Sequence, residues 1–193
     1  MDHLYADLIR LLIENYFNAA DSLALFCVSK KFAGFSSSYR EILLNAKIGW
    51  DYCVKNGKLT ACQFLYRTTN IDIHANNDEA FQWSCDNGHL AMAQWFYQVS
   101  INTNKKINIH DRNELTFRWS CHNGHLVVVQ WLYQLSTQIN SPIDIHAMNE
   151  GAFQWSCDNG HSAVAQWLYQ LSIDISSPID PKILSTYGSI IFD

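Results

Sequence analysis

The sequence predicts an all-α repeat solenoid that follows an N-terminal helical segment. A block of nine residues occurs three times, at 81–89, 117–125 and 153–161, so the copies are 36 residues apart. Each copy is followed by an apolar stretch with helical spacing. The chain is 48% hydrophobic and 16% charged, which is typical of a folded protein. Because one such repeat cannot bury its own apolar face, we expect the copies to stack.

Each repeat is expected to contain two helices. The first, at about 79–86, ends at an Asn-Gly pair whose glycine supplies a positive φ. The second, at about 90–99, has a buried stripe that includes Met92, Ala93, Trp95 and Phe96. The connecting segments at 71–74, 107–110 and 143–146, called fingers below, alternate Ile with polar residues and are predicted to be extended.

Tryptophan recurs in two sets, at 83, 119 and 155 and at 95, 131 and 167. Large side chains at helical spacing usually pack, so we interpret both sets chiefly as core. The alternative is that one edge of a set anchors a partner protein, because Trp is common in binding hot spots.

No enzyme, cofactor or metal is expected. Cys85 and His89 are four residues apart, and the pair recurs in each copy, but a structural zinc needs four convergent ligands. A glycine-rich phosphate loop and the common nucleophile motifs are absent from the sequence. The six cysteines are interpreted as reduced and mostly buried.

The charge distribution favours a protein partner. Residues 1–67 hold eight Lys/Arg against six Asp/Glu, about +2, and residues 68–193 hold five against twelve, about −7, which together give the net −5. The acidic part would be repelled by phosphate backbones, so no nucleic-acid partner is expected. Without a secretory signal or a membrane-spanning stretch in the sequence, we expect a soluble, intracellular monomer.

The repeat resembles the ankyrin repeat. Glu79 to Gln82, with Ser84-Cys85 and Gly88-His89, lines up with the family signature, although the Thr-Pro start is missing and the period is longer than usual. These departures resemble divergent ankyrin proteins of large amoebal DNA viruses. The resemblance covers 46–180, as a degenerate repeat at about 48–78 and repeats at 79–114, 115–150 and 151–180. It implies a scaffold that binds other proteins, with 181–193 as a C-terminal tail or a truncated cap.

Residues 1–45 do not share the repeat and are similar to an F-box, with matching spacing from Asp21 to Phe32. Tyr5 and Ser22 depart from that pattern, and the alternative is a plain helical cap. The resemblance implies a Skp-type adaptor that links the chain to a cullin-type ubiquitin ligase. The implied adaptor contacts are Leu4, Leu8, Leu12, Ile13, Leu25, Val28 and Phe32.

Two functions stay open. One is a substrate receptor that delivers a captured target for ubiquitination, and the other is a stand-alone ankyrin module that binds a host or viral protein without ubiquitination. In both, target contacts are expected at the finger tips and on the exposed face of the first helices, where the repeats differ. The predicted target-binding residues are Asn76, Asn77, Asp78, Gln82, Asp111, Arg112, Arg118, Met148, Asn149 and Gln154.

Overall fold

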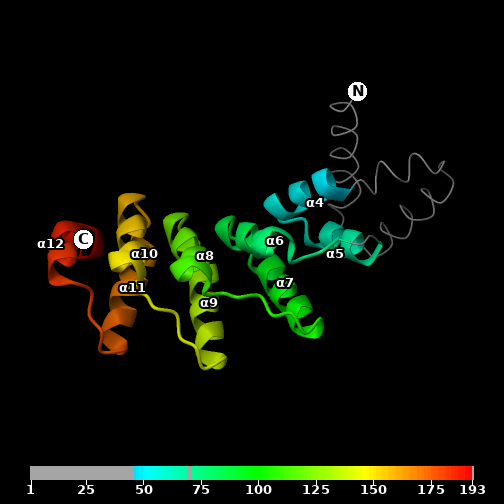
Figure 1. Cartoon of the computed structure of the whole chain (residues 1–193). Coiled ribbons are helices and arrows are strands. Elements are labelled where there is room, and N and C mark those ends of the chain that lie inside the picture. The colour runs from blue at the N-terminus through cyan, green and yellow to red at the C-terminus, as the bar shows by residue number, and fades with distance from the viewer. Residues whose placement is uncertain (1–45, 69–70, 193) are drawn as a thin grey trace. The chain divides into compact units, whose positions relative to one another are not determined.

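The computed structural model describes residues 46–68 and 71–192 (Figure 1). Over these ranges the chain forms nine α-helices and no strand, which confirms the all-α class. The predicted F-box-like segment and its seven adaptor-contact residues lie outside the described residues. The chain divides into two compact units, 1–83 and 84–193, which are described separately below.

The described part of the first unit is built around one helix pair. Helices α4 (Ala46–Lys55) and α5 (Leu59–Thr68) pack against each other. The turn between them contains Gly57, whose φ of 65° is the positive value expected of the Asn-Gly pair. Cys53, Val54 and Cys62 are fully buried between the two helices. Helix α6 (Ala75–Asp86) begins in this unit and ends in the next.

The second unit repeats the helix pair. Helices α8 (Asp111–His122) and α9 (Leu126–Gln138) form one pair, and α10 (Ala147–Asp158) and α11 (Ser162–Asp174) form the next. The first helices of the two pairs lie side by side, as do the second helices (Figure 1). Before them comes α7 (Leu90–Asn102), which extends three residues past the predicted end. Residues 181–192 form α12 (Pro181–Phe192), which packs against α10 and α11.

Equivalent apolar residues form the core of the second unit. Phe117 and Phe153 are buried on the first helices, and each such aromatic ring stabilises the fold by roughly 1.5–3 kcal/mol. On the second helices the predicted stripe is buried except for its tryptophan. Its buried members are Met92, Ala93 and Phe96 in α7, Val128, Val129 and Leu132 in α9, and Val164, Ala165 and Leu168 in α11.

The tryptophans are less buried than the sequence interpretation proposed. Trp119 is 38% exposed, and Trp83 and Trp155 are half-buried. Trp95, Trp131 and Trp167 are also half-buried, because the smaller side chains beside them fill the interior. The indole rings therefore cover the core edge instead of forming its centre.

The fingers place alternate side chains inside and outside, as their pattern predicts. Ile107 and Ile109 are buried while Asn108 is exposed, and Ile143 and Ile145 repeat this arrangement around Asp144. The fingers at 107–110 and 143–146 are each tied to the preceding helix by a buried serine. The Ser136 hydroxyl accepts a hydrogen bond from the Ile143 N–H at 3.0 Å, and Ser100 accepts one from Ile107 at 3.3 Å.

Candidate functional site

Helices α6, α8 and α10, the first helices of the three 36-residue repeats, each have three residues near their start in the left-handed region, which form a turn that we call the tip. Outside glycine this backbone costs about 1–2 kcal/mol per residue, and runs of it are rare. In every tip all three φ angles lie between 49° and 61°. The tips are Asn76, Asn77 and Asp78 in α6, Arg112, Asn113 and Glu114 in α8, and Met148, Asn149 and Glu150 in α10.

A histidine before each tip binds the acidic residue that ends it. His110 Nδ1 lies 2.9 Å from a Glu114 carboxylate oxygen, and His146 Nδ1 lies 2.8 Å from Glu150. The same pair in the first unit joins His74 to Asp78 at 2.5 Å. Asp78, predicted to bind a target, is thus already held by a histidine of its own chain.

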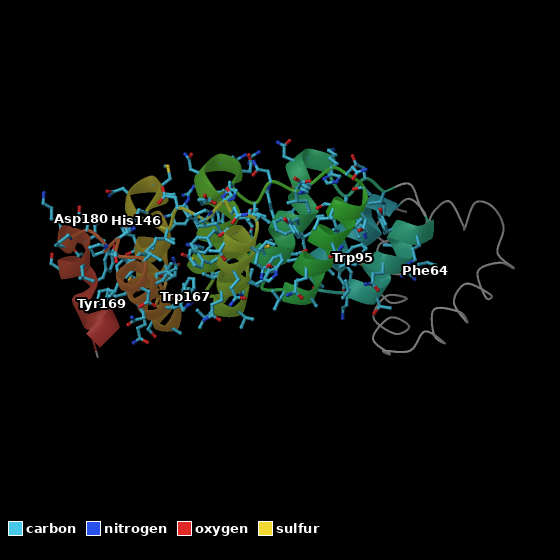
Figure 2. The ribbon with its side chains drawn as sticks, turned by 90° about the horizontal axis from the view of Figure 1, so that it is seen from below. Phe64, Trp95, His146, Trp167, Tyr169 and Asp180 are labelled. Atoms are coloured by element: carbon cyan, nitrogen blue, oxygen red, sulfur yellow. The ribbon has the colours of Figure 1, made fainter. Side chains whose placement is uncertain are left out.

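The glutamates also link each tip to the following finger. Glu114 Oε1 accepts a hydrogen bond from the Asp144 backbone N–H at 3.4 Å. Glu150 Oε1 accepts one from the Asp180 N–H at 3.2 Å while it binds His146. In Figure 2 the labels of His146 and Asp180 lie together at one end of the second unit. One carboxylate therefore fixes the tip and the start of the next segment.

A second anchor comes from the residue before each tryptophan of the first helices. Gln82 Nε2 donates to the Asn77 carbonyl at 2.7 Å, and Gln154 Nε2 donates to Asn149 at 2.6 Å. Arg118 takes this place in α8, where it donates to the carbonyl oxygens of two tip residues, Asn113 at 2.9 Å and Arg112 at 3.2 Å.

Three of these anchors are predicted target-binding residues. Gln82, Arg118 and Gln154 were expected to reach a target, and in the structure each donates a hydrogen bond to its own tip. Arg118 is only 5% exposed, so it lies beneath the surface. Burial lowers the pKa of its guanidinium, and the nearby Glu114 carboxylate raises it in part.

The remaining predicted target residues lie at the tips and are open to solvent to different degrees. Asn76, Asn77, Arg112 and Asn149 are exposed, and Met148 is 60% exposed. Asp111, the last of the ten predicted target residues, is half-buried. Its Oδ2 lies 3.4 Å from Arg112 Nε.

The structure adds Asn113, which the sequence reasoning did not name. Its Nδ2 lies 3.6 Å from the Met148 sulfur, so two successive tips touch. The available signal was that all three tips carry Asn at their second position, at 77, 113 and 149.

An aromatic cluster lies farther along the first helices. Its members are Trp119, His122 and Trp155, with centroids 4.8 Å apart for Trp119–His122 and 5.6 Å apart for Trp119–Trp155. The Arg118 guanidinium covers the Trp155 ring at 4.9 Å. Asn159 Nδ2 lies 2.9 Å from His122 Nδ1, within hydrogen-bonding distance.

The Gly-His turns join consecutive repeats of the second unit. His125 Nε2 donates to the Asp86 carbonyl at 2.9 Å, and Asn123 Nδ2 donates to the same oxygen at 2.8 Å. Burial lowers the pKa of the His125 imidazole and raises that of the Asp86 carboxyl to about 7. Burial also raises the pKa of the Cys85 thiol, so the recurring Cys-His pair lacks a reactive thiolate.

Two negative findings hold for the described part of the chain. Among residues 46–68 and 71–192, no three His, Cys, Asp or Glu side chains come together as metal ligands. Within the same ranges, no helix combines the length and apolar character needed to cross a bilayer.

Comparison of the chain with family models, with curated proteins and with solved structures finds no match in any of the three.

Proposed function

We propose that this chain is an ankyrin-type repeat protein that binds a protein target through its tips and the exposed face of its first helices. The observation that carries the proposal is the contrast within each repeat between fixed anchors and variable tips. The histidine–carboxylate pairs and the Gly-His turns recur, while the first tip residue changes from Asn76 to Arg112 to Met148.

The backbone of the tips supports a binding role. Three successive non-glycine residues in the left-handed region persist only where surrounding contacts hold them, and such strain is concentrated at ligand-binding and catalytic sites. Here the histidine–carboxylate pair and the carbonyl anchor supply these contacts. A rigid tip loses little conformational entropy on binding, which favours affinity.

The stacking of repeats into a solenoid belongs to the same proposal. It is supported by the side-by-side packing of α8 with α10 and of α9 with α11. The hydrogen bond from Asp144 to Glu114 recurs one repeat later from Asp180 to Glu150, and His125 also binds the preceding repeat at Asp86. These bonds favour a regular array.

We further propose that the chain is a substrate receptor of a cullin-type ubiquitin ligase, joined to it by a Skp-type adaptor at residues 1–45. This part rests on the sequence resemblance of that segment to an F-box. The second candidate function is a stand-alone module that occupies its target without ubiquitination, and it is favoured by the departures from the F-box pattern at Tyr5 and Ser22.

The deciding experiment measures binding of the purified chain to a Skp-type adaptor. A double variant, Leu8→Asp with Leu12→Asp, replaces two implied adaptor contacts with charge. The matched control is Val127→Asp, because Val127 is 62% exposed on α9 and tolerates a polar side chain. If the native chain and the control bind the adaptor with micromolar affinity and the double variant does not, the substrate-receptor function is supported. No binding by the native chain would leave the stand-alone module.

A further inference from the structure

Helices α4 and α5 bury two cysteines against each other. Cys53 and Cys62 are both fully buried, and their thiols are hydrogen-bonded to each other. Every cysteine in the described part of the chain is free, so this pair is reduced in the structure. The two sulfur atoms therefore lie in contact without a covalent bond between them.

Two backbone hydrogen bonds hold the cysteines close together. The Cys53 carbonyl accepts one from the Lys58 N–H at 2.8 Å, and the Cys62 N–H donates one to the Lys58 carbonyl at 3.0 Å. A single residue thus ties the last turn of α4 to the first turn of α5. Thiols that touch across two packed helices have converging Cα–Cβ bonds, which a disulfide also requires.

The same two hydrogen bonds mark the equivalent positions in the other helix pairs. His125 takes the place of Lys58, because its N–H donates to the Ser120 carbonyl and its carbonyl accepts from the Val129 N–H. The other equivalent sets are Ser84, His89 and Ala93, and Ser156, His161 and Ala165. The serine, alanine and valine side chains of these sets are all buried. Among the four described helix pairs, only α4 and α5 have a thiol at both positions.

From this arrangement we infer that Cys53 and Cys62 form a reversible disulfide that locks α4 to α5. The co-reactant is a small disulfide of the glutathione type. One cysteine thiolate attacks this disulfide, which releases one glutathione thiolate and leaves a mixed disulfide on the protein. The second cysteine thiolate then attacks the protein sulfur of the mixed disulfide and releases the other glutathione thiolate. Two protein thiols are oxidised to one disulfide, and the small disulfide is reduced to two thiols that take up the two protons.

Burial controls the rate of this exchange and leaves its equilibrium to the geometry. Removal from water raises the pKa of the Cys62 thiol, so the attacking thiolate forms only when the helix pair opens. Both the formation and the reduction of the disulfide should therefore be slow. The bond closes the loop of residues 53–62 around the turn at Gly57, which restricts the unfolded chain and stabilises this helix pair.

The test measures the equilibrium, so that slow opening does not limit it. The full chain is held at a series of ratios of reduced to oxidised glutathione until the product no longer changes, and its free thiols are then alkylated. Trypsin cuts after Lys and Arg, so it releases residues 48–55 and 59–67 as one linked product when the disulfide is present. We expect half of the native chain to be cross-linked at a ratio roughly 10- to 100-fold more reducing than in concentrated urea.

Matched variants take their residues from the equivalent positions of other repeats. Cys53→Ser and Cys62→Ala should each abolish the linked product while circular dichroism shows native helicity. The control is Cys121→Val, which should leave the glutathione ratio unchanged. Val54 and Cys121 hold equivalent positions, since the carbonyl of each accepts a hydrogen bond from the glycine of the following turn.

The remaining buried cysteines serve as an internal control. Cys85, Cys121 and Cys157 lie one repeat apart on neighbouring first helices. Packed helices are about 8–10 Å apart, and a disulfide needs Cα atoms within about 7 Å, so these thiols should stay free.

Several results would overturn the inference. A midpoint that is equal or more oxidising in the native chain than in urea would show that the folded geometry resists the bond. A stable glutathione adduct on Cys53 or Cys62 in place of the linked product would do the same, as would a product that joins two chains. The assay contains neither adaptor nor target, so its outcome is independent of the proposed function.

Discussion

At the scale of single residues, three glycines share one backbone conformation but differ in their surroundings. Gly88, Gly124 and Gly160 have φ values of 73°, 75° and 73°. A Cβ on Gly88 would lie 2.6 Å from the ring of His125, and one on Gly124 would overlap the ring of His161. A Cβ on Gly160 would meet nothing within 4 Å. The histidine of the next repeat thus fills the space that the first two glycines leave.

We predict that Gly124→Ala destabilises the protein more than Gly160→Ala does. Both variants carry the cost of a left-handed alanine, about 1 kcal/mol. Only Gly124→Ala must also displace the His161 ring, which adds roughly 1–3 kcal/mol. The free energy of unfolding, measured by urea titration, checks this. Equal losses in the two variants would mean that the histidine can move aside without cost.

Asp86 gives a pH-dependent prediction. Its folded-state pKa is raised to about 7 by burial, well above the ordinary value near 3.8, so the folded form holds its proton more tightly than the unfolded form. The favourable contribution is complete below pH 4 and is lost as the pH rises to about 7. Asp86→Asn should therefore raise stability at pH 8 by roughly 1 kcal/mol, discounted because the carboxyl is only partly buried, and change little at pH 4.

Thermal melts of native and variant protein at the two pH values measure this difference. Asp158→Asn is the matched control, because Asp158 occupies the equivalent exposed position two repeats later and accepts a hydrogen bond from Tyr187. An Asp86→Asn variant that is equally stabilised at pH 4 and pH 8 would exclude the titration of this carboxyl as the cause.

At the scale of the elements, the sequence predicted the helix pairs but not the left-handed tips. Apolar spacing and the Asn-Gly pairs were enough to find α7, α9 and α11 to within a few residues at their ends. Asn, Asp, Glu, Arg and Met have no propensity for three successive positive φ angles, so no local rule would place a tip there. The local signals were the Asn at the second position of each tip and the acidic residue four positions after each finger histidine.

The carbonyl anchor of the tip gives a prediction for Arg118. Gln82 and Gln154 show that a glutamine amide can make the same bond to the tip. Arg118→Gln should therefore keep the native stability to within about 1 kcal/mol. Arg118→Ala should cost roughly 1–3 kcal/mol, because it leaves tip carbonyl groups without a donor.

Urea unfolding of the two Arg118 variants separates these outcomes. If Arg118→Gln lost as much stability as Arg118→Ala, the contribution of Arg118 would come from its charge over Trp155 and not from the hydrogen bonds to the tip.

At the scale of the whole molecule, the periodicity fixed the number and order of the helix pairs, because a repeat of 36 residues leaves few ways to arrange two helices and a finger. The site was less predictable. Three of the ten predicted target residues, Gln82, Arg118 and Gln154, donate hydrogen bonds to carbonyl groups of the tips. A fourth, Asp78, pairs with His74. Variation between repeats does not distinguish a residue that contacts only a partner from one that bonds its own tip, since both can differ without loss of the fold.

Target binding is expected to depend on the second tip. The double variant Asp111→Ala with Arg112→Ala should weaken capture of a protein target in a binding assay while the melting temperature stays within a few degrees. The two side chains form a largely exposed ion pair, which contributes little to stability. Arg112→Ala keeps an L-residue with a φ of 49°, so the backbone cost is unchanged. A marked fall in melting temperature would show that the pair belongs to the scaffold.

The left-handed tips also limit how this surface can diversify. The nine tip positions have φ between 49° and 61°, and Asn, Asp, Glu, Arg and Met occupy them. Valine, isoleucine and threonine are disfavoured there by their branched Cβ, and proline is excluded by its ring. A randomised library at these sites should therefore yield binders rich in polar and long unbranched side chains. The backbone conformation thus restricts which residue types can occupy the tips, whatever the target.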